Sequence, residues 1–167
     1  MAGPFESVAG FIILPGMRRL NPAYLASLYE RVRAAPFPHH ISMQLVEIEL
    51  DRCRVELEAG TQHLQPFGIV HGGVIATLVD TATFWAAFAP IPEDAGLVNV
   101  DLKLNYLEPG RPGRLIAEGT LIRGGRTVSY SEATIRSHDG RLLARGASTL
   151  MVLPGKGLDI PAPKFLD

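Results

Sequence analysis

The chain has 167 residues and a formal net charge of −1 at pH 7. This length fits one domain that can bury most of its apolar surface without disulfide support. The near-zero charge gives no basis for recognition by overall charge, so neither nucleic acid nor a membrane surface is expected as a partner. The single cysteine, Cys53, can form no internal disulfide and has no neighbours at metal-ligand spacing. A reducing, cytoplasmic environment is therefore expected.

The N-terminal part of the chain predicts one helix and no export signal. Its apolar run is short, ends at Pro15 and has no basic residue before it, unlike a secretory signal. Residues 21–35 place apolar side chains at helical spacing behind Asn21, a suitable N-cap, and Pro22, which suits a first helical position. This segment is expected to form an amphipathic helix.

The middle of the chain predicts strands followed by one enclosed helix. The PFPHH stretch at 36–40 is expected to break the first helix. Residues 41–60 alternate apolar and polar side chains and predict one or two strands. Residues 74–88 are apolar on all sides and rich in alanine, which is typical of a helix buried within other structure. Asp80 lies inside this stretch and no basic residues flank it, so a membrane span is not expected.

The C-terminal half is dominated by strand-like runs at residues 97–109, 113–124, 126–139 and 140–154. Turn-forming residues separate them, including Asp139 followed by Gly140, a strong hairpin signal. The connections are too short for parallel crossovers, so an antiparallel meander is predicted. Residues 154–167 are punctuated by Pro and Gly and are expected to be mobile or to lie along a neighbour.

These elements predict an α+β architecture in one domain. An antiparallel sheet of five to six strands is expected to wrap around a long central helix, with an extra N-terminal helix before it. We divide the chain into an N-terminal extension with the amphipathic helix (1–39), the main domain (40–153) and a C-terminal tail (154–167). A half-covered sheet and an all-apolar helix need more cover than one chain offers, so a homodimer is expected.

Two stretches, QPFGIVHGGVIATLVDTA and VNVDLKLNYLEPGRPG, together with the RGGRT hairpin, resemble the hotdog-fold acyl-CoA thioesterases of the phenylacetate-degradation (PaaI) type. The resemblance covers roughly residues 40–153; its most specific feature is GxxHGG followed by an apolar helix with an aspartate nine residues after the histidine. It implies a hotdog fold and hydrolysis of an acyl-CoA thioester to free acid and CoA. It also implies composite active sites in a dimer, and leaves open whether dimers pair into tetramers.

Gly72 and Gly73 stand at the predicted start of the central helix. Unpaired backbone N–H groups there, with the positive end of the helix dipole, suit a carbonyl oxygen that becomes negative during reaction. This outlines an oxyanion hole, and the missing side chains let a thioester approach the backbone. The alternative is that the two glycines only form a tight turn.

Asp80 is the candidate general base or nucleophile. A buried, unpaired carboxylate is costly, and perturbed carboxylates in clefts are often catalytic; capping or pairing with an arginine is the alternative. Gly72 and Asp80 are eight positions apart, a rise of about 12 Å in a helix. One carbonyl group cannot reach both on one helix, so Gly72 or Gly73 of one chain is expected to work with Asp80 of its partner.

Three further polar residues belong to the candidate catalytic set. Gln65 precedes Gly72 by seven residues, where the resemblance usually places an Asn; its amide could hold the thioester, or it could cap a loop. Asn99 falls where relatives place a Ser or Thr that holds the hydrolytic water, and could instead end a strand. The resemblance implies that His71 supports the turn more often than it acts as a base.

Other histidines and the arginines complete the predictions. His63 could line the entrance, but has no second ligand at metal spacing, and no metal or cofactor is expected. His39 and His40 are expected to be exposed. Arginines at strand ends and turns (Arg111, Arg114, Arg123 and Arg126) are expected to cluster and meet the phosphates of CoA, with solvated arginine as the alternative.

The resemblance places CoA along Tyr106, Leu107, Pro109, Arg111, Arg123, Gly124, Gly125, Arg126 and Thr127. Phe84, Trp85 and Phe88 are expected to shape the acyl pocket, with core packing as the alternative. A non-catalytic acyl-CoA-binding protein on the same fold is the rival function from another class.

Overall fold

The computed structural model describes residues 18–166, so residues 1–17 of the expected N-terminal extension lie outside the described part. The helices are α1 (Pro22–Ala34), α2 (Pro36–His40), the 3-10 turn η1 (Thr61–His63) and α3 (Gly72–Phe88). The strands are β1 (Arg19–Leu20), β2 (Met43–Ile48), β3 (Arg52–Ala59), β4 (Gly96–Asn99), β5 (Lys103–Tyr106), β6 (Gly113–Arg123), β7 (Val128–Ser137), β8 (Leu142–Leu153) and β9 (Phe165–Leu166).

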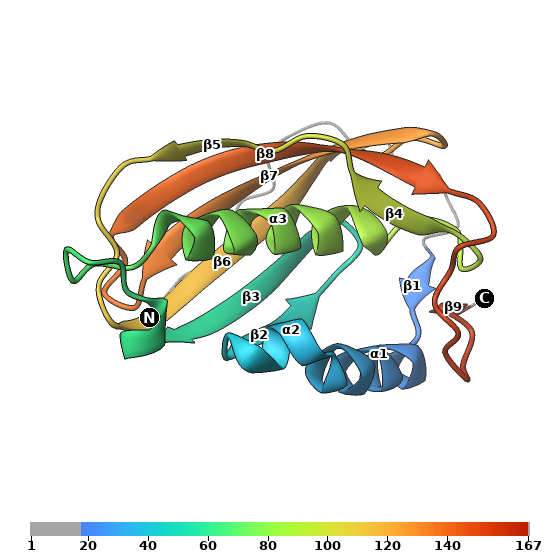
Figure 1. Ribbon diagram of the computed structural model, residues 1–167. Helices are drawn as coiled ribbons and strands as arrows, with labels where there is room; N and C mark the ends of the chain where they lie inside the picture. The colour runs from blue at the N-terminus through green and yellow to red at the C-terminus, as the bar shows by residue number, and fades with distance from the viewer. Residues whose placement is uncertain (1–17, 167) are drawn as a thin grey trace.

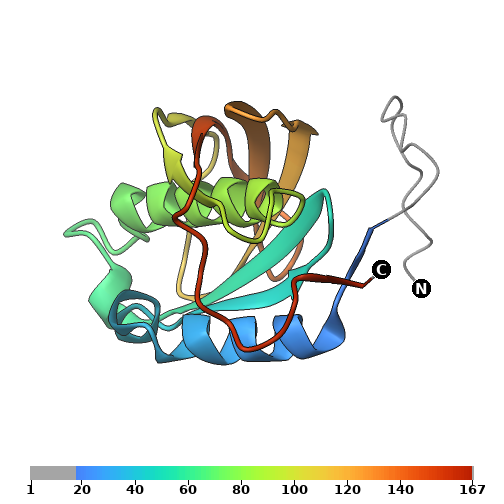
Figure 2. The same ribbon diagram turned by 90° about the vertical axis from the view of Figure 1, so that its right-hand side faces the viewer.

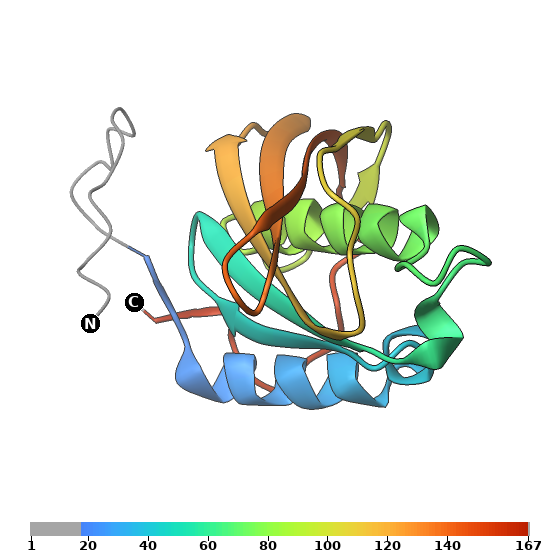
Figure 3. The same cartoon turned by 90° about the vertical axis from the view of Figure 1, so that its left-hand side faces the viewer.

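A seven-stranded antiparallel sheet in the order β2-β3-β6-β7-β8-β4, with β5 also paired to β8, curves around α3 (Figures 1 and 3). The α+β class and the β6–β7–β8 meander are confirmed.

The run at 97–109 forms two strands, β4 and β5, rather than one. Asp101 interrupts it because its carboxylate accepts the amide hydrogen of Thr149 at 2.8 Å, and the sheet gains one segment over the five to six expected.

The central helix α3 packs closely on the sheet. A Cβ on Gly119 of β6 would lie 2.2 Å from the carbonyl oxygen of Ala82, so only glycine permits this approach. The Cys53 thiol donates to the same oxygen at 3.1 Å, and burial raises its pKa to about 12. This thiol is therefore a core group rather than a nucleophile.

The N-terminal helices lie against the β2 end of the sheet. As predicted, Asn21 caps α1, its side-chain oxygen accepting the Ala23 amide hydrogen at 3.0 Å, and Tyr24 and Leu28 are buried. The first helix ends at Ala34, which confirms the predicted break, and residues 36–40 form the separate short helix α2. Pro36 falls at the first position of α2, where a missing N–H group costs nothing.

Residues 154–166, which we call the C-terminal strap, run from the end of β8 past the C-terminal end of α3 to α1 (Figure 2). Leu158 and Ile160 pack against the core, and β9 pairs with β1. The strap packs on its own chain, which corrects the expectation of a mobile tail or one lying along a neighbour. Within residues 18–166, no helix has the length and apolar character needed to cross a membrane.

Candidate active site

The start of α3 leaves one backbone amide free. His71 is the N-cap, and its Nδ1 accepts the Gly73 amide hydrogen at 2.8 Å. The Gly72 N–H group has no hydrogen-bond partner among residues 18–166. The helix begins at Gly72, two residues before the apolar run at Val74, as the assignment of the two glycines to the helix start predicted. Of the two predicted oxyanion donors, Gly72 is available and Gly73 is occupied by the cap.

The free amide opens into a cavity of about 550 Å³, which we call the glycine cleft. Tyr106 lies over the helix start, and its hydroxyl donates to the Gly72 carbonyl oxygen at 3.1 Å. Predicted site residues that line the cleft are Gln65, His71, Gly72, Gly73, Tyr106, Leu107 and Pro109. The structure thus brings together the predicted oxyanion residues and the first part of the predicted CoA path.

Asp80 is partnered, contrary to the expectation of a buried, unpaired carboxylate. Asp80 is exposed in the single chain. The Asn99 side-chain amide donates to Asp80 Oδ1 at 2.7 Å. Partial burial raises the pKa of Asp80, and this hydrogen bond opposes the increase. Asn99 therefore contacts the candidate base itself.

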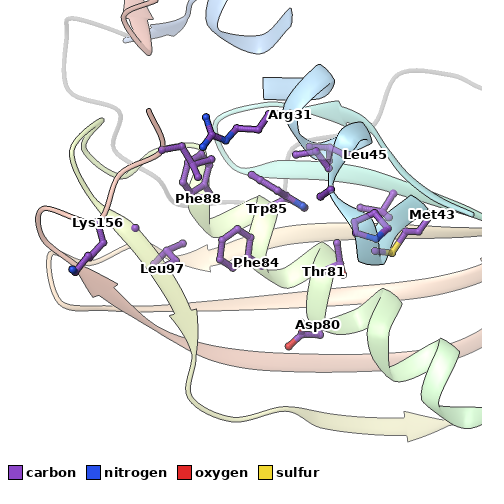
Figure 4. Close-up of a pocket in the computed structure, with 16 residues that line it drawn as sticks. Arg31, Met43, Leu45, Asp80, Thr81, Phe84, Trp85, Phe88, Leu97 and Lys156 are labelled. Carbon is purple, nitrogen blue, oxygen red and sulfur yellow. The ribbon is translucent and has the colours of Figure 1, made fainter. Parts of the chain in front are cut away.

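Asp80 opens into a second cavity of about 480 Å³, which we call the aromatic cavity. Phe84, Trp85 and Phe88 all line it, and Figure 4 shows them following Asp80 along α3. Their rings pack on one another, with centroids 5.0 Å apart for Phe84 and Trp85 and 5.2 Å apart for Trp85 and Phe88. They therefore belong to the core packing and to the cavity wall together.

Sequence reasoning missed the other walls of the aromatic cavity. These come from α1, β2, β3, the start of β4 and the strap, and include Arg31, Val32, Met43, Leu45, Val55, Leu97, Lys156 and Leu158. No motif marks these residues, because only the tertiary fold brings the segments together.

Gly72 and Asp80 do not share a cavity in the single chain. Gly72 lines the glycine cleft and Asp80 lines the aromatic cavity. Their separation along α3 is about 12 Å, several times the distance over which a donor and an attacking group can serve one carbonyl. Within one chain, these two groups therefore cannot act on the same carbonyl group.

The four arginines do not cluster within one chain, which corrects the sequence prediction. Arg114 and Arg123 lie near opposite ends of β6, an 11-residue strand, and are separated by about 30 Å at ordinary strand rise. Arg111 follows Gly110, the last residue of the glycine cleft. The Arg123–Thr127 hairpin lies at the β4 end of the sheet, since β4 and the first residue of β7 both pair with Met151.

The remaining histidines have structural surroundings. His63 is buried rather than at an entrance; its Nδ1 accepts the Gly60 amide hydrogen, and its Nε2 lies 3.0 Å from the Ile41 carbonyl oxygen. His39 and His40 are exposed on α2, as expected. Among the described residues, no group of three or more His, Cys, Asp or Glu side chains is arranged to hold a metal ion.

Comparison with known proteins finds similarity to one family of enzymes. Residues 67–144 match the thioesterase superfamily. A Caenorhabditis elegans protein with a provisional esterase name is 27% identical over 160 residues, covering 93% of this chain and 94% of that protein. A 1,4-dihydroxy-2-naphthoyl-CoA hydrolase of Listeria monocytogenes is 28% identical over 112 residues, covering 67% of this chain and 91% of that protein.

The fold agrees with the sequence matches. The crystal structure of a Haemophilus influenzae thioesterase aligns with a TM-score of 0.74 at 25% identity, covering 83% of this chain and 96% of that chain. The curved sheet around α3 and the HGG helix start agree with these matches, which show that the chain is similar to the thioesterase superfamily and has the hotdog fold.

Proposed function

We propose that the protein hydrolyses an acyl-CoA thioester to free acid and CoA, in sites shared between two copies of the chain. The observation that carries this proposal is the separation of one free amide, Gly72, from one candidate base, Asp80, into two cavities along one helix. The Listeria relative that is named as a CoA-thioester hydrolase supports the choice of substrate class.

The uncovered edge of the sheet supports a dimer. Val98, Val100 and Leu102 at the β4–β5 edge are exposed, Val100 to 62%, and Asp80 is exposed beside β4. Exposed apolar side chains on an edge are commonly covered by a second chain. A twofold axis here would run two α3 helices antiparallel, so Gly72 of each chain faces Asp80 of the other. Two equivalent sites result.

The reaction follows from these two halves. The thioester carbonyl oxygen accepts the Gly72 N–H, and the positive end of α3 stabilises the negative charge that develops on it. Asp80 of the partner either removes a proton from the attacking water or attacks the carbonyl carbon itself, in which case water then cleaves the anhydride. The C–S bond breaks and the CoA thiolate leaves; it is too weakly basic to need a strong acid.

Asn99 and His71 support the two reacting ends. Asn99 orients Asp80 and favours its ionised form, because the amide donates to the carboxylate. His71 holds the helix start, and Gln65 faces the thioester from the wall of the glycine cleft. No metal or cofactor is required by this scheme.

The same dimer would gather the separated phosphate-binding groups. Tyr106, Leu107 and Pro109 border the glycine cleft and Arg111 follows them. The hairpin Arg123–Thr127 lies at the Asp80 end of its own chain, so it approaches the cleft of the partner when Asp80 does. Guanidinium and glycine amide groups from the two chains then meet the CoA phosphates.

A thiol-release assay with aromatic, short-chain and long-chain acyl-CoAs tests the proposal. Stoichiometric release of CoA with multiple turnovers is the expected result. The rival, a non-catalytic acyl-CoA-binding protein, predicts tight binding of the same compounds without thiol release, and that outcome would overturn the proposal.

A further inference from the structure

We propose that the C-terminal strap forms the far wall of the acyl site and sets the longest apolar acyl chain that the enzyme accepts, with Leu158 as the residue that determines this limit. The inference rests on the proposed acyl-CoA hydrolysis and names the acyl class for that site. The strap lies outside the part of the chain that matches the thioesterase superfamily, residues 67–144.

A buried lysine fixes the strap to the end of α3. Lys164 is only 1% exposed, and its Nζ donates to the carbonyl oxygens of Phe88 at 2.6 Å and Ile91 at 3.0 Å. It also lies 4.1 Å from the centre of the Phe88 ring, and its backbone amide donates to Glu93 at 2.9 Å. These bonds satisfy carbonyl groups at a helix end that would otherwise be buried without donors.

The other end of the strap is fixed on both sides of Leu158. The Gly157 amide donates to the Asp94 carbonyl oxygen at 2.9 Å, and a Cβ on Gly157 would lie 2.2 Å from the Glu93 carbonyl oxygen. Arg31 of α1 donates to the carbonyl oxygen of Asp159 at 2.6 Å. Leu158 is thus held against the aromatic cavity by contacts immediately before and after it.

The cavity runs from the candidate base to this wall. Asp80 and Phe88 are eight residues apart on α3, a distance of about 12 Å, and Figure 4 shows Asp80 and Phe88 at opposite ends of the aromatic run. Apolar side chains line the interior, while the charged groups lie at the ends. An acyl chain whose carbonyl is at Asp80 therefore extends between aromatic rings until it reaches the strap.

The lining selects an apolar acyl group. Besides Asp80, the polar groups at the cavity are Thr81 next to it, the indole N–H of Trp85, and Arg31 and Lys156 at the rim. A hydroxyl carried into the interior would lose its hydrogen bonds to water, and the Trp85 N–H could replace only one of them, as a donor. Aliphatic and unsubstituted arylalkyl groups fit this surface better than hydroxylated aromatic ones.

Substitutions of Leu158 test the wall directly. We would measure kcat/KM for straight-chain acyl-CoAs from butanoyl to hexadecanoyl with Leu158→Ala, Leu158→Phe and the control Ile160→Ala. Ile160 packs against the core on the same strap but does not line the cavity. Leu158→Ala should extend the accepted length and Leu158→Phe should shorten it, changing kcat/KM for chains at the limit by about tenfold. The Ile160→Ala profile should match the wild-type profile.

Binding provides a readout that does not depend on catalysis. Trp85 is the only tryptophan and lines the cavity, so its fluorescence reports occupancy by each acyl-CoA. The proposal is overturned if the length limit, by turnover or by Trp85 fluorescence, is the same in both Leu158 variants and the wild type. Absence of thiol release with a shifted binding limit would overturn hydrolysis and leave the role of the strap standing.

Discussion

The glycine cleft and the aromatic cavity lie along the same helix but are built differently. The cleft presents backbone groups: one free amide, one capped amide and a carbonyl oxygen held by Tyr106. The aromatic cavity presents side chains from α1, β2, β3, α3 and the strap. In the proposed reaction this difference separates two tasks, because fixed backbone dipoles suit a developing charge and packed side chains suit selection of an acyl group.

Removing the Asp80 carboxylate should have the largest effect on kcat. Asp80→Asn keeps the size of the side chain but cannot act as a base or a nucleophile, so kcat should fall by about a hundredfold or more. Thiol release with the best substrate measures this, and size-exclusion chromatography checks that the oligomer persists. Turnover equal to that of the wild type would remove Asp80 from the mechanism.

Removing the free Gly72 amide from the glycine cleft should have the next largest effect on kcat. Proline suits the first position of a helix, and the extended backbone of His71 is compatible with a following proline. Gly72→Pro therefore deletes the N–H group and should lower kcat by about 10²–10³-fold.

Gly72→Ala is the matched control for this change, because it keeps the N–H group. Its Cβ would lie 3.2 Å from the Tyr106 hydroxyl oxygen, which the side chain can accommodate by a small shift. If alanine and proline at this position lower kcat equally, the loss comes from bulk and the amide has no role in the reaction.

The Asn99 contact should act through the pKa of Asp80. Burial raises that pKa and the Asn99 amide lowers it, so Asn99→Ala should raise it further. Because the ionised carboxylate is the active form, activity is lost as pH falls through this pKa, and the acidic limb of kcat/KM should move to higher pH. Asn105→Ala, on the exposed part of β5, is the control. If the acidic limb of kcat/KM lies at the same pH in Asn99→Ala as in the wild type, the assigned contact between Asn99 and Asp80 is contradicted.

Lys164→Met should affect stability more than chemistry. It removes the donors to two buried carbonyl groups, at a cost of about 1–3 kcal/mol in the free energy of unfolding. Burial lowers the pKa of Lys164 from 10.5 to about 7. Between these values the unfolded chain binds a proton that the folded chain does not, so the free energy of unfolding rises with pH in the wild type.

In Lys164→Met, the part of the pH-dependent rise in the free energy of unfolding that comes from Lys164 should disappear. Urea unfolding at neutral and mildly alkaline pH measures it, with Lys156→Met, an exposed lysine on the same strap, as the control. An identical pH dependence in the wild type and Lys164→Met would show that Lys164 keeps its proton in the folded state.

Local patterns were enough to predict much of the fold. Asn21 and Pro22 mark the start of α1, the all-apolar run predicts α3, and Asp139 with Gly140 marks the β7–β8 hairpin. The helix-start side of the glycine cleft could also be predicted from a local pattern, because Gln65, His71, Gly72 and Gly73 stand close together in the sequence. In each case the physical cause acts within a few residues: a cap, a helical periodicity or a turn.

Features that depend on distant contacts were missed. Asp101 ends β4 because it bonds to Thr149, a strand away. Lys164 is buried because carbonyl groups at the end of α3 accept its hydrogens, although lysine is rarely buried. The separation of Arg114 from Arg123 follows from the length of β6, which agrees with the strand predicted at 113–124; the expected arginine cluster did not take that length into account.

The shared site is tested most directly by mixing two inactive chains. We would co-express Asp80→Asn and Gly72→Pro chains with different affinity tags and isolate the mixed dimer. If Gly72 of one chain works with Asp80 of the other, one site carries both changes and the other carries neither, so the mixed dimer should show about half of the wild-type activity per dimer. If both groups of a site came from one chain, every site would carry a defect, and the mixed dimer would be as inactive as its parents.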